Sequence, residues 1–260
     1  LVPSRAGCSR SSNSIGWIAC SPWARGFAEP APGLNRANVS DHRAGDRGFS
    51  PFAVKRSKSS QRWLQRQASD PFVRRSKEDG YRSRAAYKLL ELDRKDRLLR
   101  PGLTVVDLGA APGGWSQVAA RGVGPRGRVL ALDLLDMPPV DGVDIITGDF
   151  DDEVVLARAL AWLGDQPADL VLSDMAPNVS GMRAVDQPRS MLLVELAIDF
   201  AERTLKPGGD LVVKAFQGAG FDEALRQLRG RFDKVACRKP EASRSQSRET
   251  YFVAKGLRVG

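Results

Sequence analysis

The sequence predicts an α/β fold, in which a mostly parallel sheet of seven strands is covered by helices on both faces. Two observations lead to this prediction. Short apolar runs alternate with longer segments whose apolar residues recur at helical spacing, from about residue 83 onward. Turns such as Pro101-Gly102 and Lys206-Pro-Gly-Gly209 separate several of these segments. Strand–helix alternation is typical of parallel sheets, whose ligands bind beyond the carboxyl ends of the strands.

The expected elements follow one another in a regular order. A first helix near residues 83–96 has alanines and leucines on or near one face, and Pro101-Gly102 ends that unit. Apolar runs predict strands near residues 103–107, 128–133, 143–147, 168–173, 210–215, 232–237 and 250–255. Helical spacing predicts further helices near residues 114–121, 152–163, 188–205 and 221–229.

The length of 260 residues fits one α/β domain with an N-terminal extension. Residues 1–53 are rich in Ser, Arg, Gly, Pro and Asn and lack periodicity, so we expect them to be disordered. They are consistent with a start site placed too early, a nucleic-acid-binding tail or a targeting peptide. Residues 54–100 are expected to form a basic segment with the first helix of the domain, and residues 101–260 the core of the domain.

Positive charge is concentrated on both sides of an acidic middle. The formal net charge is +9, yet residues 101–200 carry 6 basic and 15 acidic side chains. Residues 51–100 carry 15 basic and 6 acidic side chains, and residues 201–260 carry 13 and 7. A generic basic surface is one interpretation. Two basic segments around a ligand-binding middle favour a polyanionic partner, most simply a nucleic acid.

Several classes of protein are disfavoured. The three cysteines show no C-x-x-C spacing and His42 is the only histidine, so we expect neither a metal site nor a Cys–His nucleophile. No apolar run reaches the roughly 18 residues of a membrane helix, and nothing indicates an oxidising compartment, so we expect a cytoplasmic protein. We also expect a monomer, because no spare amphipathic helix or heptad pattern remains.

A glycine-rich turn joins the first strand to the next helix and predicts a ligand. The stretch from Asp107 to Trp115 reads D-L-G-A-A-P-G-G-W. Glycines let the backbone approach a bound molecule closely. The turn lacks both the G-x-G-x-x-G spacing of dinucleotide sites and the G-K-S/T of a P-loop. The sequence therefore points to a nucleoside ligand without phosphates to hold, and S-adenosylmethionine is the obvious candidate.

Acids at later strand ends extend this candidate cofactor site. Asp133 ends the second strand, 24 positions after Gly109, where it can accept hydrogen bonds from both ribose hydroxyls. Asp149 ends the third strand and can accept from the adenine amino group. Gly113 and Trp115 are expected to line the path of the methionine and adenosine. An ordinary strand-end carboxylate and a core tryptophan are the competing interpretations of Asp133 and Trp115.

Charged residues also mark the strands after the acidic middle. Asp174 follows the strand at 168–173, and Lys214 ends an otherwise apolar strand, where burial is costly unless the amine is paired or used. Lys88 lies on the first helix, and Glu249 directly precedes the last strand. A lysine that extends into solvent from a strand end, and solvated surface charges at positions 88 and 249, are the alternative interpretations.

From about Arg56 onward, the chain resembles the FtsJ/RrmJ (RlmE) family of S-adenosylmethionine-dependent RNA ribose 2′-O-methyltransferases. The motifs that carry the resemblance are S-R-A-A-Y-K-L, V-D-L-G-A-A-P-G-G-W-S-Q, L-D-L-L-D-M, G-D-F, L-V-L-S-D-M-A-P-N-x-S-G, D-Q-P-R, L-K-P-G-G, V-V-K-A-F-Q-G and R-K-P-x-A-S-R-x-x-S-R-E-T-Y. The resemblance implies a Rossmann-like methyltransferase fold. It also implies a catalytic tetrad of Lys88, Asp174, Lys214 and Glu249, with Asp174 near the cofactor as well.

The chemistry of that reaction suits these residue types. A ribose hydroxyl is a poor nucleophile until a base accepts its proton, and we assign that role to Lys214 as a hypothesis. Burial and the charge of Lys88 would lower the pKa of Lys214, while Asp174 would hold Lys214 and offset part of that shift. Glu249 would orient Lys88 or the ribose. A sulfonium supplies its own leaving group, so no metal is required.

The resemblance further implies the substrate, an A-loop uridine of the large-subunit (23S) ribosomal RNA in the assembled subunit. The basic segments Lys55–Arg84 and Arg238–Arg248 would then contact RNA phosphates. Three alternatives remain at this point. The same chemistry could act on tRNA or an mRNA cap, the chain could be a non-catalytic assembly factor, or it could be a nicotinamide dehydrogenase, which the glycine spacing disfavours.

Overall fold

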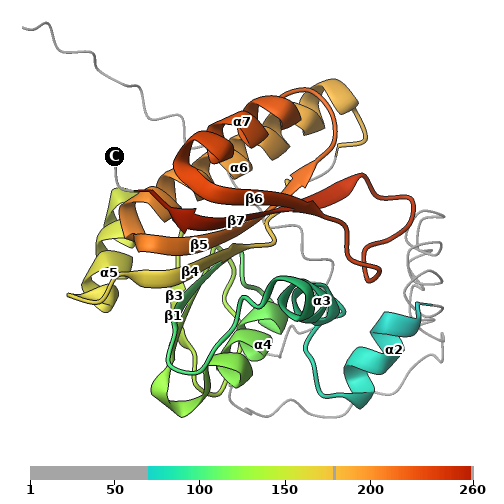
Figure 1. The fold of residues 1–260 in the computed structure, drawn as a ribbon. Coiled ribbons are helices and arrows are strands. Elements are labelled where there is room, and N and C mark those ends of the chain that lie inside the picture. Colours follow the sequence, from blue (N-terminus) through green and yellow to red (C-terminus); the bar gives the residue numbers. More distant parts are fainter. Residues whose placement is uncertain (1–69, 178–179, 259–260) are drawn as a thin grey trace, which may run out of the picture.

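The computed structural model describes residues 70–177 and 180–258, which form one sheet with helices on both sides (Figure 1). The predictions for residues 1–53, including those about their disorder and origin, lie outside the described residues. The helices are α2 (Pro71–Glu78), α3 (Ala86–Asp96), α4 (Gly114–Val123), α5 (Glu153–Leu163), α6 (Arg183–Thr204) and α7 (Phe221–Arg231), with a short 3₁₀ helix η1 (Gly124–Arg126). The strands are β1 (Thr104–Leu108), β2 (Arg128–Asp133), β3 (Asp144–Thr147), β4 (Ala168–Ser173), β5 (Leu205–Phe216), β6 (Phe232–Arg238) and β7 (Glu249–Leu257).

The seven strands are arranged in the order β3-β2-β1-β4-β5-β7-β6. Strands β1 to β5 pair in parallel, whereas β7 runs antiparallel to both β5 and β6. Because β7 is reversed, its first residue lies at the edge where the parallel strands end. This confirms the predicted α/β fold with a mostly parallel sheet, and it brings Glu249 to the edge at which ligands bind in such folds.

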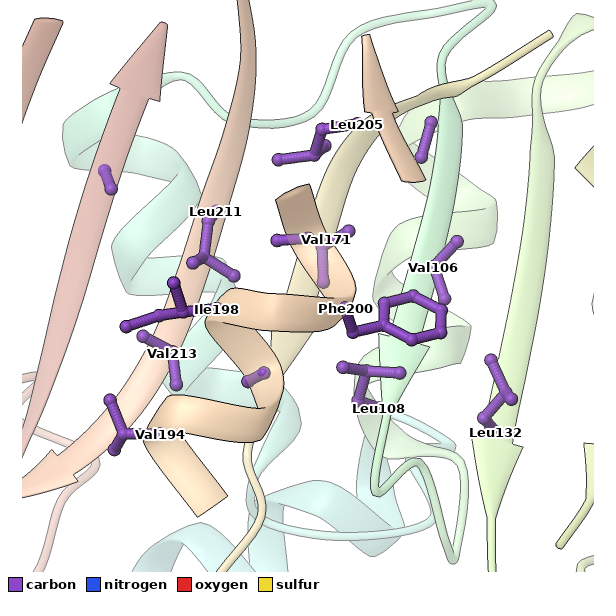
Figure 2. Packing of buried hydrophobic residues seen from close by; sticks show 14 of the residues in the cluster. Val106, Leu108, Leu132, Val171, Val194, Ile198, Phe200, Leu205, Leu211 and Val213 are labelled. Atoms are coloured by element: carbon purple, nitrogen blue, oxygen red, sulfur yellow. The ribbon is translucent and has the colours of Figure 1, made fainter. Parts of the chain in front are cut away.

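Alternate residues of the central strands fill two separate cores. Val106, Leu108, Val171, Leu211 and Val213 face α5, α6 and α7, with α6 contributing many of the buried side chains (Figure 2). The residues between them face α3 and α4, where Val105, Leu172, Val212 and Val253 are buried. This period of two follows from the strand geometry. It predicts that Lys214, two residues after Val212, points toward α3 and α4.

Helix α2 was not expected from the sequence, because its segment has few apolar residues. Its start nevertheless carries a local signal, since Asp70 precedes Pro71 and its carboxylate accepts a hydrogen bond from the backbone N–H of Phe72 at 3.0 Å. The ring of Phe72 lies 5.5 Å from that of Tyr87 on α3. Packing of Phe72 against α3 therefore stabilises a helix whose own sequence contains few apolar residues.

Two boundaries around the longest helix differ from the expected ones. Helix α6 begins at Arg183 rather than near residue 188, so that Pro188 lies inside its first turns. The carboxylate of Asp186 accepts hydrogen bonds from the backbone of Ser180 and Gly181, which holds the chain ahead of the helix. Strand β5 begins directly after α6, and the segment 206–209, expected to separate the two elements, is a register shift within that strand.

The core on the α6 side leads to a stability prediction. Val194 of α6 is fully buried, whereas Val154 of α5 is 66% exposed. We expect Val194→Ala to lower the free energy of unfolding by about 2 kcal/mol, because it removes buried methyl groups and leaves a cavity. Val154→Ala is the matched control and should change it by less than about 0.5 kcal/mol. Urea denaturation measures both values, and equal effects would contradict the described packing.

Candidate active site at the carboxyl edge of the sheet

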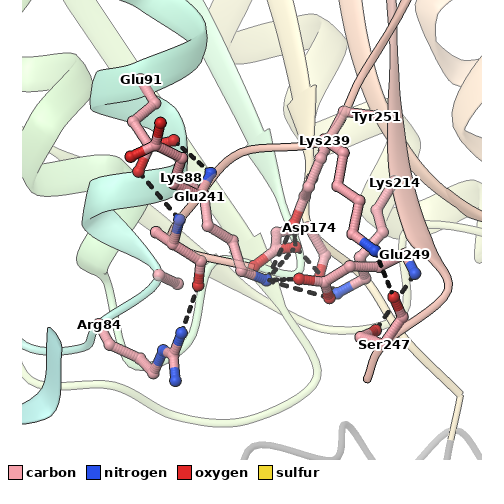
Figure 3. Close-up of polar contacts among 12 residues, drawn as sticks. Arg84, Lys88, Glu91, Asp174, Lys214, Lys239, Glu241, Ser247, Glu249 and Tyr251 are labelled. Atoms are coloured by element: carbon pink, nitrogen blue, oxygen red, sulfur yellow. Dashed lines mark hydrogen bonds and ion pairs between the residues drawn. The ribbon is translucent and has the colours of Figure 1, made fainter. Parts of the chain in front are cut away.

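Four charged side chains predicted from the sequence meet at one point beyond the carboxyl edge of the sheet (Figure 3). Lys88 comes from α3, Asp174 follows β4, Lys214 lies near the end of β5 and Glu249 begins β7. Each of the four is buried or nearly so. Buried charges are rare unless they are paired, and here two amines and two carboxylates face one another.

Asp174 lies at the centre of this group. Its Oδ1 atom is 2.9 Å from the Lys214 Nζ atom and 3.6 Å from the Lys88 Nζ atom. Lys214 also donates a hydrogen bond to the backbone oxygen of Asp174 at 2.5 Å. The Lys88 amine lies 3.2 Å from the Glu249 Oε1 atom, which completes a chain of alternating charges. The two contacts with Asp174 hold the Lys214 amine in a defined position near the carboxyl end of β5.

Tyr251 is a fifth member of the group that the sequence reasoning missed. Its hydroxyl donates to Asp174 Oδ1 at 2.6 Å and accepts from the Lys88 amine at 2.9 Å, and the side chain is fully buried. Tyr251 pairs with Lys214 across the β5–β7 ladder. The sequence could have indicated Tyr251, because residues two positions apart on a strand lie on the same face, and Tyr251 is two positions after Glu249.

Burial and neighbouring charges determine the ionisation of the group. Burial lowers the pKa of Lys214 below its usual value, and the charge of Lys88 adds to this effect while Asp174 opposes it. Burial alone would raise the pKa of Asp174, but the charges of Lys214 and Lys88 outweigh it and lower that pKa. Burial, followed by the charge of Asp174, raises the pKa of Tyr251 well above its ordinary value. Asp174 is therefore ionised, Tyr251 is neutral and the amine of Lys214 loses its proton more readily than a solvated lysine.

The glycine turn lies beside this group. Gly109 has φ +70°, and a Cβ atom there would be 2.4 Å from the Cγ atom of Met175, the residue after Asp174. Gly113 has φ +102°, and a Cβ atom there would be 3.0 Å from the Val140 Cγ2 atom. Both positions therefore require glycine for conformation and for space. The backbone of the turn therefore packs closely against Met175 and Val140 at this edge.

The two acids assigned to a nucleoside lie at the same edge. The carboxylate of Asp133 accepts hydrogen bonds from the backbone N–H groups of Ala111 and Leu135, each at 2.8 Å, and burial raises its pKa. It therefore ties the glycine turn to the loop after β2. Asp149 is half-buried and accepts from the Asp151 N–H at 3.1 Å. Their roles in cofactor binding stay predictions.

Trp115 occupies the core between α4 and the sheet. Its side chain is 3% exposed, its indole N–H donates to the backbone oxygen of Ala85 at 2.8 Å, and its ring lies 5.7 Å from that of Tyr251. The indole therefore packs behind the charged cluster, against the ring of Tyr251. Its predicted contact with a cofactor remains to be tested.

Two further observations concern metal ions and membranes. Within residues 70–177 and 180–258, no group of three or more His, Cys, Asp or Glu side chains is arranged to hold a metal ion. In the same ranges, no helix is long and apolar enough to cross a membrane.

Asp107 is a buried acid beneath the glycine turn, and its carboxylate accepts a hydrogen bond from the Ser116 hydroxyl at 2.6 Å. Burial raises its pKa to about 7, although the hydrogen bond from Ser116 acts in the opposite direction. An unfolded aspartate titrates near pH 3.9, as is usual for the side chain. Between these values the folded protein holds a proton that the unfolded chain has lost, so stability falls as the pH rises from about 4 to about 7.

Asp107→Asn should remove this dependence, because the amide does not titrate. We expect its unfolding free energy, relative to that of the unmodified protein, to rise by on the order of 1 kcal/mol per pH unit over that window. Urea denaturation at pH 5, 6, 7 and 8 measures the difference. The exposed Asp141→Asn serves as the control. A constant difference for Asp107→Asn would show that the buried acid is ionised throughout.

Comparison with known proteins agrees with this geometry. A model of the FtsJ-like methyltransferase family matches residues 81–257. The protein named ribosomal RNA large subunit methyltransferase E in Pseudomonas aeruginosa is 60% identical over 203 residues, covering 78% of this chain and 98% of that protein. The protein of the same name in Stenotrophomonas maltophilia is 62% identical over 204 residues, covering 78% of this chain and 97% of its own length.

A solved structure is also similar. The crystal structure described as a ribosomal RNA methyltransferase from Plasmodium falciparum matches with a TM-score of 0.62 and 32% identity, covering 68% of this chain and 98% of that one. The family match spans both the glycine turn and all four charged residues of the site. The fold, the site and the relatives agree, and the chain belongs to the FtsJ-like family of methyltransferases.

Proposed function

We propose that the protein transfers the methyl group of S-adenosylmethionine to a ribose 2′-hydroxyl of large-subunit ribosomal RNA, at an A-loop uridine in the assembled subunit. The observation that carries the proposal is the buried pair of lysine amines on the Asp174 carboxylate, beside a glycine turn. The names of the relatives support ribosomal RNA as the substrate. In a bacterial cell this reaction would take place in the cytoplasm.

The residues around the glycine turn fit the proposed cofactor. Gly109 and Gly113, both with positive φ, allow the tight turn at the end of β1, and Asp133 and Asp149 place carboxylates at neighbouring strand ends. Acids at these positions suit ribose hydroxyls and an adenine amino group. When bound there, S-adenosylmethionine would supply an electrophilic methyl group with its own leaving group, and Asp174 would lie near its methionine part.

The five clustered side chains account for activation of the hydroxyl. Lys214 in its neutral form accepts the proton of the attacking hydroxyl. Asp174 fixes the direction of the Lys214 amine, and its negative charge stabilises the ammonium that forms. Lys88, held by Glu249 and Tyr251, favours the neutral form of Lys214 through its positive charge.

Exposed cations near the site suit an RNA backbone. They lie on α2 and in the segment between β6 and β7, and include Arg74, Lys77, Lys239, Arg244 and Arg248. Phosphate contacts of this kind give affinity without reading base sequence and weaken steeply with salt. The basic residues 55–69 lie outside the described part of the chain. The predictions of a monomer and of the domain boundaries at residues 53 and 100 are likewise part of this proposal.

The proposal is tested by methyl transfer from labelled S-adenosylmethionine to unmodified large ribosomal subunits, with free ribosomal RNA and tRNA in parallel. We expect alkali-resistant label on the subunit, and at least 100-fold less with Lys214→Ala, since general-base contributions are about 10² to 10⁴. Cofactor affinity, measured by titration calorimetry, should be retained in the variant. Label on tRNA alone would overturn the substrate. Cofactor binding with no label on any RNA would favour a non-catalytic assembly factor.

The rate should also depend on pH through Lys214. Below its lowered pKa, each pH unit makes the neutral amine about tenfold more abundant, so single-turnover rates should rise about tenfold per unit and then level off. Tyr251 stays protonated over this range and adds no further step. Lys214→Arg should abolish the rise, because a guanidinium does not lose its proton. An unchanged profile in Lys214→Arg would exclude Lys214 as the base.

A further inference from the structure

The segment between β6 and β7, residues 239–248, crosses the side of α3 and leads directly into Glu249 of the active site (Figure 3). We refer to residues 239–248 as the strap. Three of its cations, Lys239, Arg244 and Arg248, are exposed. The strap therefore connects exposed cations directly to Glu249 of the proposed active site.

Glu91 of α3 holds the strap through its backbone. One carboxylate oxygen accepts the N–H of Glu241 at 2.6 Å, and the other accepts the N–H of Ala242 at 3.0 Å. A carboxylate that accepts two successive backbone N–H groups makes charge-assisted bonds, which are stronger than neutral ones. Neither N–H belongs to a helix or strand ladder, so Glu91 supplies bonds that the strap would otherwise lack.

Arg84 holds the same point of the strap from the turn before α3. Its guanidinium donates to the backbone oxygen of Ala242 and forms an ion pair with Asp70, the N-cap of α2. Ala242 is fully buried. Helix α2, helix α3 and the strap are thus joined around Ala242. Glu91 lies three residues after Lys88, on the same side of α3.

Bonds within the strap give it a defined shape once it is held. Ser243 donates its N–H to the oxygen of Pro240, and Ser247 donates its N–H to the oxygen of Arg244, each at 2.9 Å. The Lys239 amine donates to the backbone oxygen of Ser247 at 2.9 Å, which closes the loop. The attachment at Glu91 therefore positions the whole turn that carries Arg244.

The held strap brings like charges together. Burial lowers the pKa of Arg84, and the positive charge of Arg244 lowers it further. Asp70 already pairs with the Arg84 guanidinium and offsets part of this effect. The exposed Arg244 and Arg248 have no such partner among the described contacts, so the held strap presents two cations that suit an anionic partner.

We propose that Glu91 is a positioning residue that holds Arg244 and Arg248 in the geometry that binds the RNA substrate. This inference rests on the proposed function. One contact joins Glu249 to the strap, since its backbone N–H donates to the Ser247 hydroxyl at 3.2 Å. The inference nevertheless predicts a larger effect on RNA binding than on chemistry, because Glu249 also has contacts outside the strap. Glu249 pairs with Phe216 in the β5–β7 ladder, and Lys88 contacts its carboxylate from inside α3.

The test is Glu91→Gln, whose amide oxygen can still accept one backbone N–H while its NH₂ group faces the other donor. We expect the KM for unmodified large ribosomal subunits to rise by roughly fivefold or more, with kcat within about twofold and unchanged affinity for S-adenosylmethionine. Hydrogen exchange of the peptide that spans residues 240–244 should become about tenfold faster. Glu91→Ala, which removes both acceptors, should show larger changes of the same kind.

Glu195→Gln is the matched control, because it makes the same charge change at an exposed position of α6. It should leave KM and exchange unaltered. Faster exchange in Glu91→Gln with an unchanged KM would overturn the proposal, as would unaltered exchange. If the unmodified protein transfers no methyl group to the subunits, the proposed function fails. In that case the affinity of each variant for ribosomal subunits, measured at equilibrium, tests the role of the strap. Equal affinities of Glu91→Gln and the unmodified protein would overturn that role.

Discussion

The desolvated carboxylate of Asp174 is the group on which the rest of the site depends. A buried carboxylate that lacks partners is strongly destabilising, and the loss of one partner from such a pair costs several kcal/mol. Asp174 is satisfied by Lys214, Lys88 and the Tyr251 hydroxyl together. These partners come from β5, α3 and β7, so all three elements have to meet at the end of β4. The same interaction fixes the position of the Lys214 amine, which the proposed proton transfer requires.

The reversal of β7 makes this meeting possible. In an entirely parallel sheet, the first residues of a strand lie at the edge away from the ligand. Because β7 runs antiparallel to β5, its first residues lie instead beside the last residues of β5. Glu249 and Tyr251, on one face of β7, thereby reach Lys88 on the helix that covers that face. The antiparallel direction of β7 thus adds the Glu249 carboxylate and the Tyr251 hydroxyl to the cluster of Lys88, Asp174 and Lys214.

Helix α3 connects the charged cluster to the strap. Lys88, on its buried side, belongs to the charged cluster, whereas Glu91, one turn later, binds the backbone of the strap. The ion pair between Arg84 and Asp70 adds α2 to the same unit. A helix that contacts both parts fixes the distance between the strap and Lys88, and in the proposed reaction it would position the RNA relative to Lys214. Positioning of this kind lowers the entropic part of a bimolecular barrier.

The sequence by itself determined the order of strands and helices, the glycine turn and the charged residues at the strand ends. These features depend on local periodicity and on short motifs, which a single stretch of chain contains. Only the tertiary structure decided the meeting of Lys88 with Glu249, the participation of Tyr251 and the attachment of the strap to Glu91. It also decided the formation of α2. These features depend on contacts between segments far apart in the chain, and the folded sheet alone fixes which of their side chains meet.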